Sequence, residues 1–425
     1  VTTYPTVTVH KSFFTDSQGY LILPKNLEIG HYRIEEVTAP DGYVVNKNYV
    51  EITVDSDTAY EVDGVSGDVI IEVSYEDQPV KGNLIVYKKG EMLSGFENDF
   101  IYKEQYLSGA EFEVRAAEDI CTPDHQKDAD GNRIVLYAKD TLVTTITTGE
   151  GGKAVAKDLP LGRYYVVETK APEGFVLNPE PVKVALTYQD QDTPIVEAEA
   201  IVGNDRQKVS ISVEKQDAEN GRVLSGAVFG IYNKKNIQAN GKVLVKADTL
   251  LQEMTSDENG MATCTLDLPF GEYYVKELKA PEGFVSSDEV LEFVAEYQGQ
   301  ETKIVSLQAV KKNEPTTAEF TKSDLTTGVE LEGARLKVMD KDGNVIDEWT
   351  SEKDKPHVIK RLVVGETYTL HEEFAPYGYL KATDVTFKVK DTAEAQKVEM
   401  KDEVPKGLLI INKKGEFLEK ITLLD

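Results

Sequence analysis

A strand that carries an acid on its apolar face recurs through this chain, and no other sequence feature restricts the possible fold as strongly. In GRYYVVETKAPEGF, residues 162–175, the two-residue period of a strand puts Tyr164, Val166 and Glu168 on one face. An ionised carboxylate buried there is costly unless another group pairs with it or it takes up a proton. The other copies begin at Gly30, Gly271 and Gly365, and the four acids are Glu36, Glu168, Glu277 and Glu372.

Two further strand signals repeat with the first, and each also brings a polar side chain to the apolar face. An opening strand puts a lysine in phase with aliphatic residues, as in Leu84, Val86 and Lys88. A closing strand ends on an inward aspartate or asparagine. The lysines are Lys88, Lys215, Lys322 and Lys413. The closing residues are Asp77, Asn204, Asn313 and Asp402.

The order of these signals predicts a string of modules. Complete modules are expected at about 80–206, 207–314 and 315–404. Residues 1–79 resemble a module without its opening strand. Residues 405–425 resemble the opening strand of a further module, because KGLLIINKKGE repeats KGNLIVYKKGE. With no initiator Met or secretory signal, and with both ends inside a repeat, the sequence is expected to be an internal piece of a longer protein.

Composition narrows the class of protein further. Tyrosine, valine, threonine and turn residues favour many short strands over helices. The 47 Lys and Arg against 75 Asp and Glu give a net charge of −28, which argues against nucleic acid or an anionic membrane as partner. No apolar run is long enough for a membrane span within this segment. The five histidines and two cysteines form no metal-ligand spacing, so no metal or other cofactor is expected.

A lysine, a glutamate and an asparagine or aspartate buried together predict a specific reaction. Burial favours the neutral lysine amine and the protonated glutamic acid. The amine can then attack the side-chain carbonyl of asparagine or aspartic acid, while glutamate transfers protons as general acid and base. The product is an isopeptide bond, formed once and without turnover, so no enzyme is predicted. The expected sets are Lys88, Glu168 and Asn204; Lys215, Glu277 and Asn313; and Lys322, Glu372 and Asp402.

Two further interpretations stay open at this stage, one of these trios and one of a polar insertion. Each set could be an unreacted buried network, with lysine and glutamate ion-paired and the third residue hydrogen-bonded. Separately, the polar insertion that contains Asp124 has the aspartate spacing with which a calcium loop begins, but no glutamate follows at the required place. An exposed loop is the better interpretation of the insertion.

These motifs resemble the Cna-B or SpaA-type immunoglobulin-like domains of Gram-positive surface proteins and pilins. The family signature Tyr-x-hydrophobic-x-Glu-x-x-Ala-Pro-x-Gly-Tyr is met at residues 32–43, 164–175, 273–284 and 368–379, with Phe as the last residue of two copies. The resemblance implies tandem antiparallel β-sandwiches, with lysine on the first strand, asparagine or aspartate on the last, and glutamate as the catalytic residue. Two departures are evident: Glu36 and Asp77 have no lysine strand, and Lys413 stands alone.

The resemblance also implies a function and a location. We expect the stalk or pilin-like shaft of a protein at the cell surface or cell wall of a Gram-positive bacterium, joined by sortase to the cell wall or to other subunits. No Leu-Pro-x-Thr-Gly sorting signal is present in the sequence. The alternatives are an adhesin module that binds a host protein or glycan, and spacer modules of a secreted carbohydrate-active enzyme. The strand of Lys413 could also complete the first module of another copy and react with Asp77.

Overall fold

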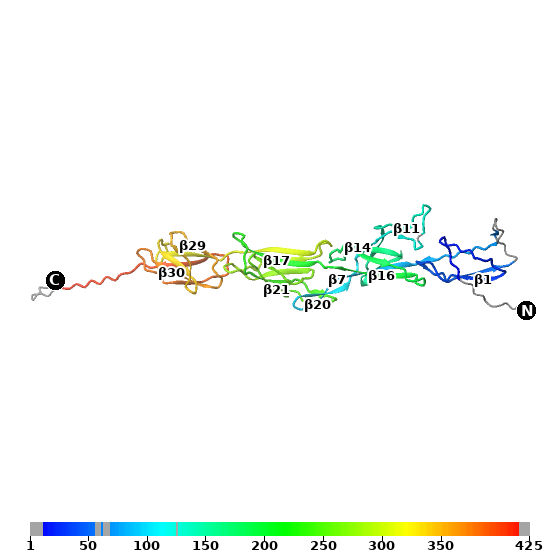
Figure 1. The fold of residues 1–425 in the computed structure, drawn as a ribbon. Helices are drawn as coiled ribbons and strands as arrows, with labels where there is room; N and C mark the ends of the chain where they lie inside the picture. Colours follow the sequence, from blue (N-terminus) through cyan, green and yellow to red (C-terminus); the bar gives the residue numbers. More distant parts are fainter. Residues whose placement is uncertain (1–11, 56–60, 63–68, 125, 416–425) are drawn as a thin grey trace, which may run out of the picture. The chain divides into compact units, whose positions relative to one another are not determined.

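The computed structural model describes residues 12–55, 61–62, 69–124 and 126–415. Regular structure in these residues is almost entirely strand (Figure 1). Their one helical element is the short 3-10 turn η1 (Glu150–Gly152). The ends of the expected first module and of the expected last strand, residues 1–11 and 416–425, lie outside the described residues. The all-β prediction is confirmed.

The chain forms two compact units. The first comprises residues 1–94, 101–207 and 297–303. The second comprises residues 95–100, 208–296 and 304–425.

Residues 12–79, the first segment, belong to the first unit and contain short strands. These are β1 (Gly30–Glu35), β2 (Tyr43–Val44), β3 (Tyr49–Val54), β4 (Glu61–Val62), β5 (Val69–Ile70) and β6 (Gln78–Pro79). They pair antiparallel, β1 with β3, β2 with β6 and β4 with β5. The expected closing strand should run on to Asp77, but residues 71–77 lie in no strand. A closing strand needs an opening strand beside it, and the described part of this segment provides none.

Residues 80–206, the second segment, form two facing sheets. The strands are β7 (Lys81–Phe96), β8 (Phe100–Tyr106), β9 (Glu111–Ala116), β10 (Ile120–Cys121), β11 (Val135–Tyr137), β12 (Leu142–Thr147), β13 (Lys153–Pro160), β14 (Gly162–Lys170), β15 (Val182–Leu186) and β16 (Ile195–Asn204). One sheet has the antiparallel order β12-β9-β14-β15 and the other the order β13-β7-β16. Within the second sheet, β16 runs parallel to β7, so the opening and closing strands lie side by side.

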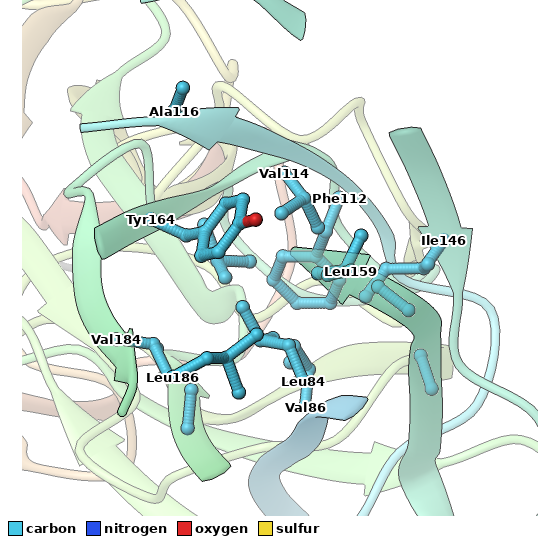
Figure 2. Close-up of a cluster of buried hydrophobic side chains, with 14 of the residues drawn as sticks. Leu84, Val86, Phe112, Val114, Ala116, Ile146, Leu159, Tyr164, Val184 and Leu186 are labelled. Carbon is cyan, nitrogen blue, oxygen red and sulfur yellow. The ribbon is translucent and has the colours of Figure 1, made fainter. Parts of the chain in front are cut away.

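The space between these sheets is filled by the alternating apolar residues that the sequence predicts. Figure 2 shows Leu84 and Val86 of β7 with Phe112 and Val114 of β9 and Tyr164 of β14, all of them fully buried. Burying a side chain of this size contributes about 1.5–3 kcal/mol. This core fixes which faces of β7, β14 and β16 point inward, and therefore where their polar residues go.

One element of the second segment was not predicted. The opening strand continues past Lys88 to Phe96 and returns as β8, which pairs with β7. The connecting residues Glu97–Asp99 contain no Asn-Gly or Asp-Gly pair, which is the strongest short-range signal for a hairpin.

Residues 207–314, the third segment, repeat this arrangement. The strands are β17 (Lys208–Asp217), β18 (Val228–Asn233), β19 (Ile237–Ala239), β20 (Lys242–Val245), β21 (Leu250–Thr255), β22 (Met261–Thr263), β23 (Gly271–Lys279), β24 (Leu291–Ala295) and β25 (Ile304–Asn313). The sheets have the orders β21-β18-β23-β24 and β22-β17-β25, with β25 parallel to β17.

Residues 315–404, the fourth segment, lie in the second unit and have the same two sheets. The strands are β26 (Thr317–Asp324), β27 (Arg335–Met339), β28 (Val345–Thr350), β29 (His357–Lys360), β30 (Thr367–Phe374), β31 (Val385–Lys388) and β32 (Gln396–Asp402). The sheets have the orders β28-β27-β30-β31 and β29-β26-β32, with β32 parallel to β26. Beyond them, residues 405–415 form no strand, and the apolar run Leu408–Ile411 is exposed.

Candidate functional site: buried lysine, glutamate and asparagine or aspartate trios

The parallel pairing of opening and closing strands brings each lysine close to its expected partner. In the second segment Lys88 is paired with Val202, so that Asn204 follows two residues later on the same face. The offset is identical in the other two segments. There Lys215 is paired with Lys311 ahead of Asn313, and Lys322 with Met400 ahead of Asp402.

The glutamate of each trio comes from the other sheet and lies opposite an apolar residue. Glu168 on β14 is paired with Phe112 on β9. The corresponding pairs are Glu277 with Phe229 and Glu372 with Leu336. All three apolar partners are buried. Water is therefore excluded on the side of each acid that faces the neighbouring strand.

A backbone amide ten residues further along the chain holds one carboxylate oxygen of each glutamate. Glu168 Oε2 accepts a hydrogen bond from the backbone N–H of Asn178 at 2.9 Å. The same contact joins Glu277 to the amide of Ser287 and Glu372 to that of Ala382, at 3.1 and 2.6 Å. The second oxygen, Oε1, is left to face the lysine.

The trio of the second segment is closed and fully buried. Glu168 Oε1 lies 2.9 Å from Lys88 Nζ and accepts a hydrogen bond from Asn204 Nδ2 at 3.1 Å. Lys88 Nζ in turn donates to Asn204 Oδ1. Burial holds the pKa of Lys88 below its ordinary value, although Glu168 acts in the opposite direction. One carboxylate oxygen thus contacts both the lysine amine and the asparagine amide nitrogen.

The trio of the third segment has the same members in a different arrangement. Lys215 Nζ lies 3.3 Å from Glu277 Oε1, and Asn313 Nδ2 donates to both oxygens of Glu277 at 2.9 and 2.8 Å. No described residue donates a hydrogen bond to the buried Asn313 Oδ1. Burial lowers the pKa of Lys215 to about 8. The acid therefore lies between the amine and the amide.

The trio of the fourth segment uses a carboxyl group as the third member. Lys322 Nζ lies 2.9 Å from Glu372 Oε1 and contacts Asp402 Oδ1, with all three side chains buried. Burial raises the pKa of Asp402, and Glu372 acts in the same direction, while Lys322 opposes it. The protonated carboxyl is the form that an amine can attack with loss of water.

The first segment has an acid pair without a lysine, as the sequence predicts. Glu36 Oε2 accepts the amide of Asn46 at 2.6 Å, again ten residues on. Burial, followed by hydrogen bonding and repulsion from Glu36, raises the pKa of Asp77 to about 6. The buried Asp77 Oδ1 receives no hydrogen bond from any described residue. Both side chains are half-buried rather than buried.

Lys413 is not brought to any site. It lies in the exposed run after the fourth segment, and no described acid or amide forms an ion pair or hydrogen bond with its amine. The strand that carries it is therefore unformed here.

The sequence reasoning missed two kinds of residue at these sites. The apolar partners Phe112, Phe229 and Leu336 were not predicted, although each stands two residues after a Ser-Gly-Ala or Glu-Gly-Ala sequence. The alternation that leads through Val305 to Asn313 also passes through Lys311, which is buried. Strict parity alone identifies it.

The described residues contain no group of three or more His, Cys, Asp or Glu side chains that could hold a metal ion. At the insertion, Asp128 Oδ1 accepts the backbone amides of Asp130 and Asn132, so this carboxylate stabilises a turn. His125 in the same insertion lies outside the described residues. In the part of the chain that is described, no helix has the length and apolar character needed to cross a bilayer.

Comparison with known proteins identifies the repeats. A family model described as SpaA, prealbumin-like fold domain, matches residues 2–67, 101–200, 209–309 and 316–404. The trypsin-resistant surface T6 protein of Streptococcus pyogenes serotype M6 is 28% identical over 141 residues, which is 32% of this chain and 23% of that protein. The match therefore spans less than a quarter of this relative.

The fold is shared with a solved structure. The Bacillus anthracis TIE protein has 23% identity and a TM-score of 0.50, over 85% of this chain and 55% of that chain. BcpA, the major pilin subunit of Bacillus cereus, has 15% identity and a TM-score of 0.38, over 76% of this chain and 100% of that chain. Since the family model covers more than half of its residues, this chain belongs to the SpaA family of prealbumin-like fold domains.

Proposed function

We propose that the chain is a load-bearing stalk or pilin-like shaft of a bacterial surface protein, and that residues 80–206, 207–314 and 315–404 are modules cross-linked by their own trios. The observation that carries the proposal is the double contact of Glu168 Oε1. In a fully buried site, this oxygen lies next to both Lys88 Nζ and Asn204 Nδ2.

The proposed reaction follows from these contacts. The neutral Lys88 amine attacks the side-chain carbonyl carbon of Asn204, and Glu168 takes the proton that the amine loses. The same acid returns the proton to the amide nitrogen, which leaves as ammonia. In the fourth segment Lys322 attacks the protonated carboxyl of Asp402, and water leaves instead. Each reaction replaces one carbon–heteroatom bond by an amide and needs no oxidant or cofactor.

Cross-linking would change how a module carries force. Lys88 lies on the opening strand and Asn204 at the end of the closing strand, 116 residues apart in sequence. A bond between them routes tension from one strand directly to the other, so the intervening chain carries no load. By analogy with a disulfide, closing a loop of this length stabilises the module by about 5 kcal/mol.

The family, together with the similarity to the T6 surface protein, supports a location at the Gram-positive cell surface. Attachment by sortase to other subunits or to the cell wall, and contact with host proteins or glycans, would then lie with other parts of the assembly. The trios act once on their own chain, so the protein is not an enzyme with turnover.

Peptide mapping tests the proposal. A tryptic digest of the full chain should contain a branched peptide that joins Lys88 to Asn204, and a Glu168→Gln variant should lack it. The Lys215–Asn313 and Lys322–Asp402 branches in the same digest serve as internal controls. Recovery of Lys88 and Asn204 only in separate linear peptides would overturn the proposal for this segment.

A further inference from the structure

A second buried lysine lies beside the trio of the third segment. Lys311 on β25 is paired in register with Lys215 on β17, and both side chains are fully buried. Neighbouring strands are about 4.8 Å apart, and paired residues of parallel strands point to the same face. Lys215 Nζ is also 3.5 Å from the backbone oxygen of Lys311.

The amine of Lys311 forms an ion pair with a residue at the surface. Its Nζ lies 2.8 Å from Glu289 Oε2 and donates to the backbone oxygen of Glu289 at 3.0 Å. The Glu289 side chain is 69% exposed, whereas that of Lys311 is 1% exposed. Water screens the negative charge of Glu289, whereas the positive charge of Lys311 lies in the protein interior. The charge of Glu289 therefore does not fully cancel the effect of Lys311 on Lys215.

The other segments show that a cation is not needed here for packing. Val202 of the second segment and Met400 of the fourth occupy the same register position, and both are buried. The third segment therefore has a buried charge where an apolar side chain satisfies the same fold.

Two charged side chains of the described residues act on Lys215, namely Glu277 on β23 and Lys311 on β25. The remaining strands contribute apolar residues at the facing positions: Phe229 on β18 opposite Glu277, and Ala262 on β22 opposite Val213. A neighbouring positive charge disfavours the ammonium form of a lysine, so Lys311 opposes the effect of Glu277.

We propose that Lys311 is a positioning residue for cross-linking in the third segment: its charge favours the neutral amine of Lys215 and thereby sets the pH at which that amine attacks Asn313. This inference rests on the function proposed above. Two observations on Lys215 support this role. Lys215 has a like-charged neighbour, and its amine contacts Glu277 and the backbone oxygen of Lys311 rather than its target amide on Asn313.

The test measures the rate of cross-linking against pH. The full chain is prepared unreacted in denaturant and refolded by dilution into buffers that span neutral to alkaline pH, and peptide mass spectrometry follows the Lys215–Asn313 branch over time. The Lys88–Asn204 branch in the same samples is the control. Lys311→Met, which places the residue of the fourth segment at this position, should slow the Lys215 branch about tenfold near neutral pH and move its pH profile upward by about one unit.

A second variant moves the profile in the opposite direction. Glu289→Gln removes the exposed counterion without touching the core, so the unscreened Lys311 charge should shift the profile of the Lys215 branch downward. Unchanged profiles in both variants would overturn the inference while leaving the proposed function intact. A wild-type chain that never forms the Lys215 branch at any pH would overturn the proposed function for this segment, and the inference with it.

Discussion

The acid pair of the first segment and the trio of the second segment share one plan and differ in a single component. In both, a glutamate carboxylate accepts a backbone amide ten residues on and faces an inward aspartate or asparagine. The second segment adds Lys88 on β7, and there Glu168 and Asn204 are buried. Without a lysine strand, Glu36 and Asp77 remain half-buried, and the closing strand is not formed at Asp77.

The difference teaches that the lysine strand does two things at once. It supplies the partner that the buried acid requires, and it supplies the parallel neighbour on which the closing strand is ordered.

The largest difference is expected under force. In single-molecule pulling from the chain ends, the wild-type second segment should release no length between Lys88 and Asn204. Asn204→Ala keeps the ion pair of Lys88 with Glu168 but removes the group attacked, and should release about 400 Å in addition. The first segment should extend in both proteins and serves as the reference. Release of the same length from the wild-type second segment would contradict a covalent connection.

A smaller but still large difference is expected in stability. Glu168→Ala abolishes the bond and also leaves Lys88 buried without its anionic partner. Asn204→Ala abolishes the bond and two hydrogen bonds but keeps the ion pair of Lys88 with Glu168. We expect Glu168→Ala to be less stable than Asn204→Ala by about 3–5 kcal/mol, the cost of an unpaired buried charge. The equivalent change in the first segment, Glu36→Ala, removes a half-exposed group and should lower the free energy of unfolding by less than about 1 kcal/mol. Chemical denaturation followed by segment-resolved hydrogen exchange measures all three.

The stability of the first segment, with its acid pair Glu36 and Asp77, should depend on pH where that of the cross-linked second segment does not. The pKa of Asp77 is raised from 3.8 to about 6, so the folded first segment binds this proton more tightly than the unfolded chain. Its stability should be highest below about pH 4 and should fall as the pH rises through 6. Hydrogen exchange of residues 30–54 at several pH values measures this, and Asp77→Asn should flatten the profile. A stability that rises over the same interval would contradict the assignment.

The smallest effect is expected from the exposed segment that carries Lys413, which could react with another copy of the chain. Residues 406–415 repeat the sequence of β7 and carry Lys413 where β7 carries Lys88. At high protein concentration a small fraction of chains should form a dimer that survives a denaturing gel, through attack of Lys413 on the protonated Asp77 of another copy. Lys413→Ala and Asp77→Ala should each abolish it. A dimer that persists in both variants would have another origin.

Much of this arrangement is predictable from alternation alone. The parity of Leu84, Val86 and Lys88 is enough to point the lysine inward, because burial of one strand face fixes every second residue. The same rule predicts Glu168 and Asn204. The spacing of the trio atoms is not predictable in this way, since it depends on how two sheets meet and on the register of a parallel pair. The sequence contains no local turn that sets that register.

Other features were missed for identifiable reasons. The hairpin of β7 and β8 lacks a two-residue turn signal, and its apolar pattern is weak. Lys311 follows the same two-residue alternation that predicted Asn313. It was missed because a lysine among the polar residues at the end of β25 is expected to be exposed. The different arrangement at Asn313 depends on side-chain packing around Glu277, which alternation does not encode.

The intact mass of the purified chain tests the central claim most directly, with Glu168→Ala, Glu277→Ala and Glu372→Ala beside it. Three cross-links predict a wild-type mass lower than that of the sequence by two ammonias and one water. Each variant should lack one loss, which is an ammonia for Glu168 and Glu277 and the water for Glu372. A wild-type mass equal to that of the sequence would mean that the trios are unreacted polar networks, and it would contradict the proposed load-bearing function.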